Sequence, residues 1–517
     1  MRKIFLFIVV GLSFGMMNAQ DIHDALRYSQ TNVNGTARFR AMGGAFTALG
    51  GDLSAISINP ASSVVFNNNQ AGFTLSNYNV KNESDYFGVS AKRNENTFDV
   101  NQAGVVFVFR NYDQESDWKK FSLAVNYDNL SNFNHKTRSQ GSNPNNSIGD
   151  YFVSQANGKP LNMLQVPGNY SPERWYEHLG GYLDGFQLQT AFLGYHTYLV
   201  EADNNNANNV GYYSNIPNGI YHQANYITET GYNGKVAFNF ATQYTERFHF
   251  GLNLNAHVVN YTKMNAFREY NSSPVNNAVG EIVRDVYYET DLYTYGTGFS
   301  LQLGGIVKVT DDLRLGFSYE SPTWYRLNDE VTQYISVLRE EDYENPNGNL
   351  VEGYFYSPSI QVFPEYKLQT PSKYTFGGAY VFGNKGLISV DYSIKDYSST
   401  KLRPDNGDFY QEQNDLMIDV LDVASELRVG AEAKIKQWSL RAGYNYEQSP
   451  YKNGRTIGDL QQYSAGFGYN FGATKLDLAY SRSSREYNQS LFSAGLTDAP
   501  KIDMTTNNVF LTLLFEF

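Results

Sequence analysis

Apolar and polar residues alternate along most of the chain from residue 70 onward. The stretch 248–258 is the clearest case. One face of it would carry six apolar residues: Phe248, Phe250, Leu252, Leu254, Ala256 and Val258. The other face would carry polar or small residues: His249, Gly251, Asn253, Asn255 and His257. Because the side chains of a strand point alternately to opposite sides, this pattern predicts strands that separate an apolar from a polar environment.

Short polar connections join these alternating segments in pairs. There are six of them: Asn111–Trp118, Thr245–Arg247, Thr310–Asp311, Gly383–Lys385, Lys436–Gln437 and Gly472–Thr474. If all six lie on one side, where the first strand also begins and the last one ends, the sheet has fourteen strands. We expect them at 70–80, 98–110, 119–130, 226–244, 248–269, 286–309, 312–330, 371–382, 386–397, 425–436, 438–448, 460–471, 474–486 and 504–517. An even strand number with short turns on one side and long loops on the other is typical of outer-membrane barrels.

A soluble β-sandwich would also alternate, but its apolar faces would be buried against a second sheet. Here Tyr and Phe gather near the strand ends, as they do in the aromatic girdles of membrane barrels. The last expected strand, VFLTLLFEF, ends on the aromatic residue Phe517. Such a strand resembles the signal that the barrel assembly machinery reads. We therefore expect an all-β protein, a fourteen-stranded antiparallel transmembrane β-barrel that contacts outer-membrane lipid.

The first nineteen residues read as a secretory signal peptide. Arg2 and Lys3 precede the apolar run 4–14, and the small residue Ala19 marks the expected cleavage site. No later stretch approaches the ~18 consecutive apolar residues of a membrane helix. We expect a signal peptide at 1–19, an N-terminal plug at 20–69 and the barrel at 70–517, with a large extracellular loop at 131–225. This organisation predicts export to the outer membrane of a Gram-negative cell.

The stretch 37–66, ARFRAMGGAFTALGGDLSAISINPASSVVF, does not fit the strand pattern. It carries two glycine pairs, Gly43–Gly44 and Gly50–Gly51, and later the tripeptide Asn59, Pro60 and Ala61. Glycine permits positive φ and close backbone approach, while proline removes a hydrogen-bond donor. The stretch is therefore too broken for a sheet strand or a long helix. We expect it to fill the barrel lumen as a plug.

Within the loop 131–225, Ser171, Pro172 and Glu173 form a helix start with an N-cap, a first-turn proline and an early acid. Apolar residues then recur at helical spacing: Trp175, Leu179, Leu183 and Phe186. Two interpretations remain open. This face packs a small loop domain onto the barrel mouth, or it is a surface that captures apolar ligands.

The composition of the chain excludes several kinds of functional site. The 517 residues include no cysteine, which excludes disulfides, thiolate metal sites and cysteine nucleophiles. The formal net charge of −12 argues against a nucleic-acid partner. His249 and His257 share the lumen face, but eight strand residues separate them by about 26 Å, too far for one metal ion. No catalytic signature is present, so we expect no enzyme, no cofactor and no bound metal.

The polar faces of the strands would line the lumen with charges of both signs: Arg314, Glu320, Asp391, Arg428, Glu432, Arg441, Lys475 and Asp477. We expect most of them to pair with one another and with the plug backbone. Val106 and Val108 fall on the inner face of the second strand, which leaves room for an apolar pocket wall.

The stretch 43–66 resembles the N-terminal hatch of FadL-type long-chain fatty-acid transporters, with Asp52 and Asn59-Pro60-Ala61 at the matching positions. The family often has Gly after this tripeptide, where this chain has Ser62. Two further blocks, 368–399 and 427–450, resemble the family's C-terminal half, whereas the loop 131–225 has no such match. The resemblance implies a fourteen-stranded barrel plugged by a hatch, with passive uptake of hydrophobic molecules. Ligands would be captured on loops, pass to a pocket, and leave sideways through the barrel wall as the hatch moves.

Transport of long-chain fatty acids is therefore the expected function, by a monomer that binds a hydrophobic small molecule. Three alternatives come from the same resemblance. Members also handle aromatic hydrocarbons, some relatives are described as haem receptors, and FadL-like barrels take part in type IX protein secretion. A haem receptor would need an axial ligand in the loops, for which only His178 and His196 are placed.

Overall fold

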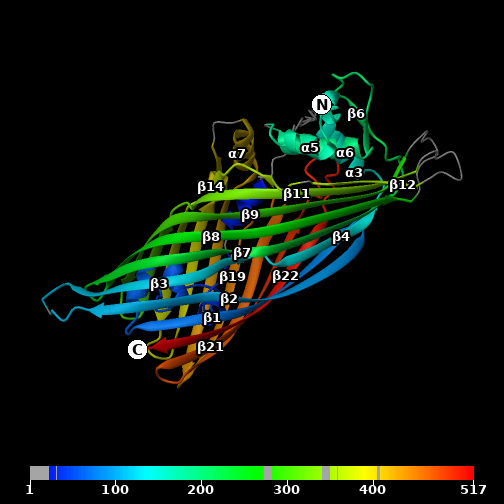
Figure 1. Cartoon of the computed structure of the whole chain (residues 1–517). Helices are drawn as coiled ribbons and strands as arrows, with labels where there is room; N and C mark the ends of the chain where they lie inside the picture. Colours follow the sequence, from blue (N-terminus) through cyan, green and yellow to red (C-terminus); the bar gives the residue numbers. More distant parts are fainter. Residues whose placement is uncertain are drawn as a thin grey trace, which may run out of the picture.

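Hydrogen bonds between the first and the last strand close one antiparallel sheet into a barrel (Figure 1). The computed structural model describes residues 22–30, 32–113, 115–182, 184–272, 282–340, 350–357, 359–404 and 408–517. The predicted signal peptide lies outside these residues.

The barrel wall consists of fourteen strands, as predicted. In order around the barrel they are β1 (Gln70–Tyr86), β2 (Val89–Arg110), β3 (Trp118–Asn132), β7 (Tyr221–Tyr244), β8 (Phe248–Asn271), β9 (Ile282–Lys308), β10 (Leu313–Glu320), β15 (Lys373–Val381), β16 (Gly386–Asp396), β18 (Val423–Ile435), β19 (Trp438–Glu447), β20 (Ile457–Asn470), β21 (Thr474–Asn488) and β22 (Lys501–Glu516). Because neighbouring strands are antiparallel, the six predicted short connections all lie at the end where β1 begins and β22 ends.

The two faces of the strands have the predicted environments. On β8, the outward side chains of Phe250 and Leu254 are 48% and 45% exposed, whereas His249, Asn253 and His257 point inward and are buried. Exposed apolar side chains recur on the outer face of every neighbouring strand of this wall. This outer face matches a lipid environment and the inner face a packed polar lumen.

The hairpin of β1 and β2 is longer than predicted. The expected loop at 81–97 is instead a continuation of both strands, which meet in a two-residue turn at Phe87 and Gly88. Both turn residues have positive φ, 49° and 76°. Such turns usually carry Asn-Gly, and a phenylalanine rarely takes this conformation, so the residue type did not signal the turn.

The strand expected at 312–330 is also different, because it breaks at residues 321–323. Pro322 lies in this break, where the missing N–H cannot interrupt a ladder. β10 precedes the break, and β11 (Trp324–Glu340) follows it and still pairs with β9. Beyond β11 the sheet continues through short strands: β12 (Leu350–Tyr356), β13 (Gln361–Val362), β14 (Tyr366–Gln369) and β17 (Lys401–Arg403).

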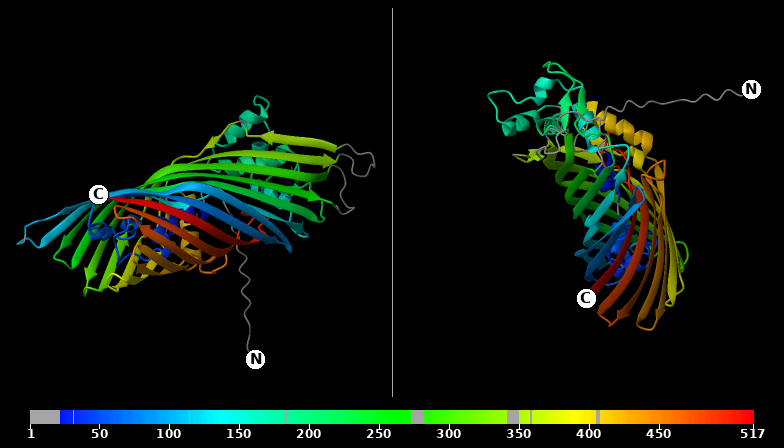
Figure 2. Two further views of the ribbon diagram at one scale, coloured as in Figure 1. Left: turned by 90° about the horizontal axis from the view of Figure 1, so that it is seen from below. Right: turned by 90° about the vertical axis from the view of Figure 1, so that its right-hand side faces the viewer.

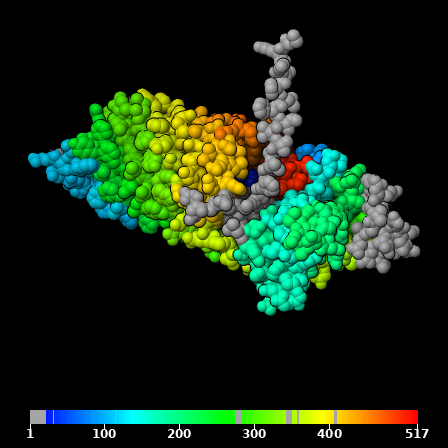
Figure 3. Space-filling model, turned by 90° about the horizontal axis from the view of Figure 1, so that it is seen from above, coloured from blue at the N-terminus to red at the C-terminus, as the bar shows by residue number. Residues whose placement is uncertain are grey.

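Residues 144–220, here called the cap domain, lie at the end of the barrel opposite the C-terminus (Figures 1 and 3). They contain α3 (Ile148–Ala156), α4 (Leu161–Leu164), α5 (Pro172–Leu179), α6 (Gly185–His196), β5 (Val200–Ala202) and β6 (Tyr212–Ser214). The strand β4 (His135–Asn143) leads into the cap domain, and α7 (Asp408–Val420) lies at the same end of the barrel.

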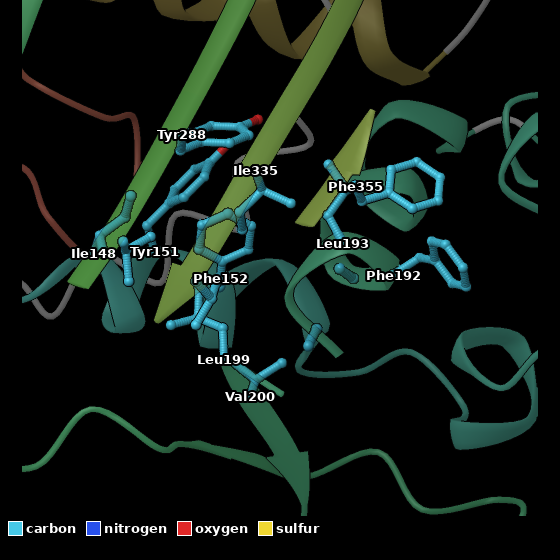
Figure 4. Packing of buried hydrophobic residues seen from close by; sticks show 14 of the residues in the cluster. Ile148, Tyr151, Phe152, Phe192, Leu193, Leu199, Val200, Tyr288, Ile335 and Phe355 are labelled. Carbon is cyan, nitrogen blue, oxygen red and sulfur yellow. The ribbon is translucent and has the colours of Figure 1, made fainter. Parts of the chain in front are cut away.

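The cap domain packs firmly onto the barrel rim. Phe152 of α3 and Phe192 of α6 are completely buried and share a cluster with Tyr288, Ile335 and Phe355 of the sheet (Figure 4). The predicted helix start at Ser171 is confirmed, since its hydroxyl accepts a hydrogen bond from the N–H of Arg174. The helix ends at Leu179, however, and Gly180 and Gly181 separate it from α6.

The N-terminal region predicted as the plug is here called the hatch, and its described residues, 22–30 and 32–69, lie inside the barrel (Figure 2). Its described elements are α1 (Ile22–Ser29), α2 (Ala37–Ala41) and the 3₁₀ helices η1 (Ser54–Ser57) and η2 (Pro60–Val65). A third 3₁₀ helix, η3 (Tyr397–Ser399), follows β16. In the described part of the chain, no helix has the length and apolar character needed to cross a membrane.

The cluster around Phe152 predicts that the cap domain can be loosened without unfolding the wall. Phe152→Ala removes a fully buried ring, a change that costs about 3–5 kcal/mol. Limited proteolysis should then cleave within 144–220 much faster than in the wild type, while the barrel keeps its heat-resistant gel mobility. Val210→Ala, at a half-exposed position of the same domain, should change neither readout. Equal resistance of the cap domain in both variants would contradict the prediction.

Candidate functional site

Glycines on the inner faces of seven wall strands bring the hatch backbone against the barrel wall. They are Gly251 on β8, Gly304 on β9, Gly316 on β10, Gly377 on β15, Gly430 on β18, Gly443 on β19 and Gly466 on β20. A Cβ atom at any of these positions would lie between 1.9 and 2.7 Å from a hatch atom. The hatch therefore occupies space that side chains would fill on an ordinary strand.

The four hatch glycines predicted as gating residues all have positive φ. The values are 61°, 77°, 64° and 66° for Gly43, Gly44, Gly50 and Gly51. Gly43 also faces the wall closely, because a Cβ there would lie 2.8 Å from the carbonyl oxygen of Tyr444. These glycines fold the hatch into tight turns, and their part in gating stays a prediction.

Asp52 organises the hatch from within. Its buried carboxylate accepts hydrogen bonds from the hydroxyl of Thr36, at 2.8 and 2.9 Å, and from the backbone N–H of Ser54, at 2.9 Å. Burial raises the pKa of Asp52, and the nearby Arg38 guanidinium opposes that shift. The acid that the family resemblance singled out thus joins α2 to η1.

The tripeptide Asn59-Pro60-Ala61 is buried where the hatch meets β7, β8 and β9. The Asn59 Nδ2 donates to the carbonyl oxygens of Thr47, at 2.7 Å, and Gly305, at 3.1 Å. Its Oδ1 accepts from the N–H of Ala61, which caps η2. The carbonyl oxygen of Pro60 accepts a hydrogen bond of 2.9 Å from Asn239 of the wall. These residues anchor the middle of the hatch to the wall.

Charged pairs hold the opposite side of the hatch, as the lumen charges predicted. The hatch residue Arg38 lies 2.9 Å from Glu432, which also pairs with Arg441 at 2.7 Å. Arg441 reaches Asp477 at 2.5 Å. Because buried charges are stable only when paired, this chain of ions favours one position of the hatch.

The barrel wall is interrupted between β2 and β3. Their pairing stops at Gln102 and Asp128, and in the described part of the chain residues 89–101 of β2 pair with no strand on that side. Beyond β3, the strand β4 pairs with β7 but lies against the inner face of β1. The inward side chain of Asn82 on β1 donates to the carbonyl oxygen of Lys136 on β4, at 2.8 Å. β4 is therefore displaced into the lumen, behind the β1–β2 hairpin.

A cavity of about 440 Å³, the upper cavity, lies between α1, the cap domain and the wall. Much of its lining is apolar or aromatic: Leu26, Tyr151, Phe186, Tyr288, Leu292, Val331, Leu491 and Phe492. Charged groups also face it: Asp24, Arg27, Glu229, Lys263 and Arg485. Volumes of roughly 300–1,000 Å³ are usual for small-molecule sites.

A second cavity of about 220 Å³, the lower cavity, lies beside the wall interruption. Its lining includes the whole segment 131–135, where β3 gives way to β4, together with Val33 and Arg40 of the hatch. The two cavities share five lining residues: Arg27, Gln30, His135, Arg485 and Met504. The two cavities are therefore adjacent, and the lower one lies at the end of β3, where the wall is interrupted.

The residues predicted to capture ligands lie in different environments. Trp175 and Leu179 are buried in the cap-domain core, and the indole N–H of Trp175 donates to the carbonyl oxygen of Met163 at 2.9 Å. This placement supports the packing interpretation for both. Phe186 lines the upper cavity, and Leu183 lies outside the described residues.

The two residues predicted as an apolar pocket wall, Val106 and Val108, pack against the hatch. Val106 is fully buried against Leu53 and Ile56 of the hatch, with Val108 packed beside it, and neither lines the upper or the lower cavity. Sequence reasoning missed α1, Arg27 and Arg485 as cavity-forming elements. For Arg485, the one signal in the sequence was a basic residue at an inward position of a strand.

Residues 202–509, more than half of the chain, match the sequence model of the outer membrane protein transport protein family (OMPP1/FadL/TodX). The chain belongs to this family. It is thus an outer-membrane transporter of hydrophobic compounds. Its family consists of transport channels, which are not enzymes. No curated protein matches the chain.

The first two of the following solved structures share its fold. A FadL homologue of Pseudomonas aeruginosa is 12% identical with a TM-score of 0.54, over 95% of this chain and 100% of that one. The deltaS2 mutant of the TodX monoaromatic hydrocarbon channel is 14% identical with a TM-score of 0.50, over 93% and 99% of the two chains. The Ralstonia pickettii toluene transporter TbuX is 14% identical with a TM-score of 0.46, over 94% and 99%.

The glycine contacts predict that one methyl group on β9 will disturb the hatch. Gly304→Ala would place a Cβ 1.9 Å from Asn59 Oδ1 and 2.7 Å from Pro60 Cδ. Overpacking of this kind costs about 1–3 kcal/mol. Amide hydrogen exchange in residues 41–66 should accelerate. The adjacent Gly305→Ala is the matched control, because its Cβ would face outward with its nearest neighbour at 3.7 Å. Equal exchange in both variants would disprove the close contact.

Asn59→Ala should alter transport more than barrel stability. It removes two donors and an N-cap from the hatch, worth about 1–3 kcal/mol locally, but leaves the strand ladder intact. Ligand uptake should change severalfold while the heat-resistant barrel band persists. Asn68→Ala, at an exposed position just after the hatch core, should leave uptake unchanged. Loss of the folded band in Asn59→Ala would contradict this expectation.

Proposed function

We propose that this transporter takes up long-chain fatty acids passively, through the upper and lower cavities and the gap between β2 and β3. The observation that carries the proposal is the position of the two adjacent cavities, between the cap domain and the end of β3 where the wall is interrupted. The hatch fills the rest of the lumen, so a straight passage along the barrel axis is closed in this conformation. A sideways exit needs no large opening through the hatch.

The first step is capture at the cap domain. Tyr151 and Phe186 present aromatic surface to the upper cavity from the cap side, and Leu491 and Phe492 present apolar surface from the β21–β22 connection. Removing apolar surface from water is worth about 25 cal/mol per Å². A long acyl chain therefore gains most of its binding energy here.

The second step is transfer past α1. This helix is anchored by Leu26 and Tyr28, which are buried among aromatic residues including Tyr261 and Tyr325. The helix lies between the upper cavity and the rest of the hatch, and Arg27 and Gln30 line both cavities. A ligand in either cavity can therefore contact the side chains of Arg27 and Gln30.

The third step is exit to the lipid. The upper half of β2, which pairs with β1 but not with β3, carries exposed apolar side chains at Phe98 and Val100, which are 68% and 48% exposed. A ligand that leaves through the gap would meet membrane lipid at these side chains. Such an exit releases an apolar molecule without passing it through water.

A fatty acid fits the lining better than an aromatic hydrocarbon does. Both cavities combine apolar side chains with charged and polar groups, so they offer contacts to the carboxylate as well as to the acyl chain of a fatty acid. The haem alternative has less support, because the rings of His178 and His196 stack on Trp175 and Phe192.

Uptake of labelled palmitate and of labelled toluene by cells with and without the protein tests the proposal. We expect protein-dependent uptake of palmitate. Val331→Trp fills the upper cavity from β11 and should reduce that uptake about tenfold or more. Thr332→Trp, which points to the opposite face of the same strand, should not reduce it. Uptake of toluene alone would reassign the ligand class, and unchanged uptake in Val331→Trp would exclude the upper cavity from the route.

A further inference from the structure

We propose that the periplasmic mouth of the barrel binds an acidic segment of a soluble partner protein. This mouth lies at the end with the six short connections, where Figure 1 marks the C-terminus, and that end faces the periplasm in outer-membrane barrels. One half of the mouth is lined by four cations on the inner face of the wall: Arg110 of β2, Lys120 of β3, Lys308 of β9 and Arg314 of β10. The inference does not depend on which compound the transporter carries.

Three of the four cations contact the backbone of the hatch. The Nζ of Lys120 donates to the carbonyl oxygen of Phe66 at 2.8 Å. Arg110 donates to the carbonyl oxygen of Asn67, also at 2.8 Å, and Arg314 donates to a third hatch carbonyl oxygen at 3.1 Å. These neutral acceptors fix the side chains at the mouth, but they bring no negative charge to compensate the cations.

The four cations form two like-charged pairs on neighbouring strands. Arg110 lies directly opposite Lys120 in the register of β2 and β3. Lys308 lies directly opposite Arg314 in the register of β9 and β10, and its charge also acts on Lys120 across the mouth. Like charges directly opposite each other destabilise a sheet. A bound anion would remove this repulsion.

No carboxylate of the described residues forms an ion pair with any of the four cations. The Nζ of Lys308 has no hydrogen bond there either. Glu246 and Asp311 act on Lys308 only from beyond ion-pair distance, and no acid acts on Arg314. This half of the mouth therefore carries an uncompensated positive charge.

The other half of the mouth is different, because its cations are paired. Lys434 lies 3.8 Å from Glu432, and Lys475 lies 3.0 Å from Glu516. The whole chain has a net charge of −12, so the excess of cations between β2 and β10 runs against its composition. The unpaired half is therefore the part that is complementary to an acidic partner.

The spread of the cations indicates the size of the anion. They occupy four of the six adjacent strands from β2 to β10, which at ~4.8 Å per strand extend about 24 Å along the wall. One phosphate or carboxylate is too small to bridge that arc, whereas an extended peptide of about seven residues spans it. Arg110 is exposed and the other three cations are half-buried, so a chain in the periplasm reaches all four.

Binding of fluorescent octaglutamate to the purified full-length protein in dodecyl maltoside tests the inference, with octaglutamine as the uncharged probe. We expect octaglutamate to bind about tenfold or more tightly than octaglutamine, with a preference that salt screens. Lys308→Gln and Arg110→Gln should each weaken octaglutamate binding about threefold, and the double variant about tenfold. Neither substitution removes an ion pair, so we expect both variants to fold.

Lys92→Gln is the matched control, because Lys92 lies on the same strand as Arg110 but at the opposite end, with a side chain 58% exposed. It should change octaglutamate binding less than about twofold. Heat-resistant gel mobility reports folding of every variant. Equal affinity for the two peptides would overturn the inference, as would equal losses in Lys92→Gln and the double variant. Displacement of octaglutamate by acetate at the same carboxylate concentration would assign the mouth to small anions and would also overturn it.

Discussion

The hatch can lie inside the barrel because the wall strands beside it carry glycine at the points of closest approach. A barrel of fourteen strands encloses a lumen approaching that of the ~16–18-stranded porins, which is wide enough to conduct water. Here glycines such as Gly304, Gly316 and Gly443 let the hatch backbone approach the wall within van der Waals distance. The wall and the hatch therefore depend on each other, since neither surface is complementary to anything else in the molecule.

Close contact alone would not be enough, because an irregular backbone inside a barrel must have its polar groups satisfied. Inward side chains of the wall meet this need. Asn253 donates to the carbonyl oxygen of Ile56, Gln302 donates to that of Ile58, and Ser464 donates to that of Ala41. Small inward residues create the space, and amides and hydroxyls between them supply the hydrogen bonds. This division explains why the lumen face reads in the sequence as glycine, serine and asparagine with few bulky residues.

Much of the fold could be predicted from the sequence because a membrane barrel repeats one rule on every strand, an apolar outer face and a polar inner face. That rule predicted the fourteen strands, and the stretch 37–66, which does not follow it, was predicted to be the plug. It could not locate the inward displacement of β4, which depends on pairing with β7 across the whole cap domain. Nor could it show that Trp175 and Leu179 are buried whereas Phe186 reaches a cavity. That difference arises where Gly180 and Gly181 end α5, and glycines at those positions were a usable signal.

The candidate site was harder to predict than the fold, because it is formed by residues that are distant in sequence and that individually follow the barrel rule. Arg485 occupies an ordinary inward position on β21, and Arg40 lies two residues after Arg38 in a short helix, about half a turn away. The environments of Arg38 and Arg40 nevertheless differ in kind. Arg38 meets the buried carboxylate of Glu432, so its charge stabilises the position of the hatch. Arg40 meets a hydroxyl and an aromatic ring, so its charge is left without compensation at a cavity. The hydrogen bond to Ser481 and the contact with the ring of Phe510 therefore hold Arg40 in place without an ion pair.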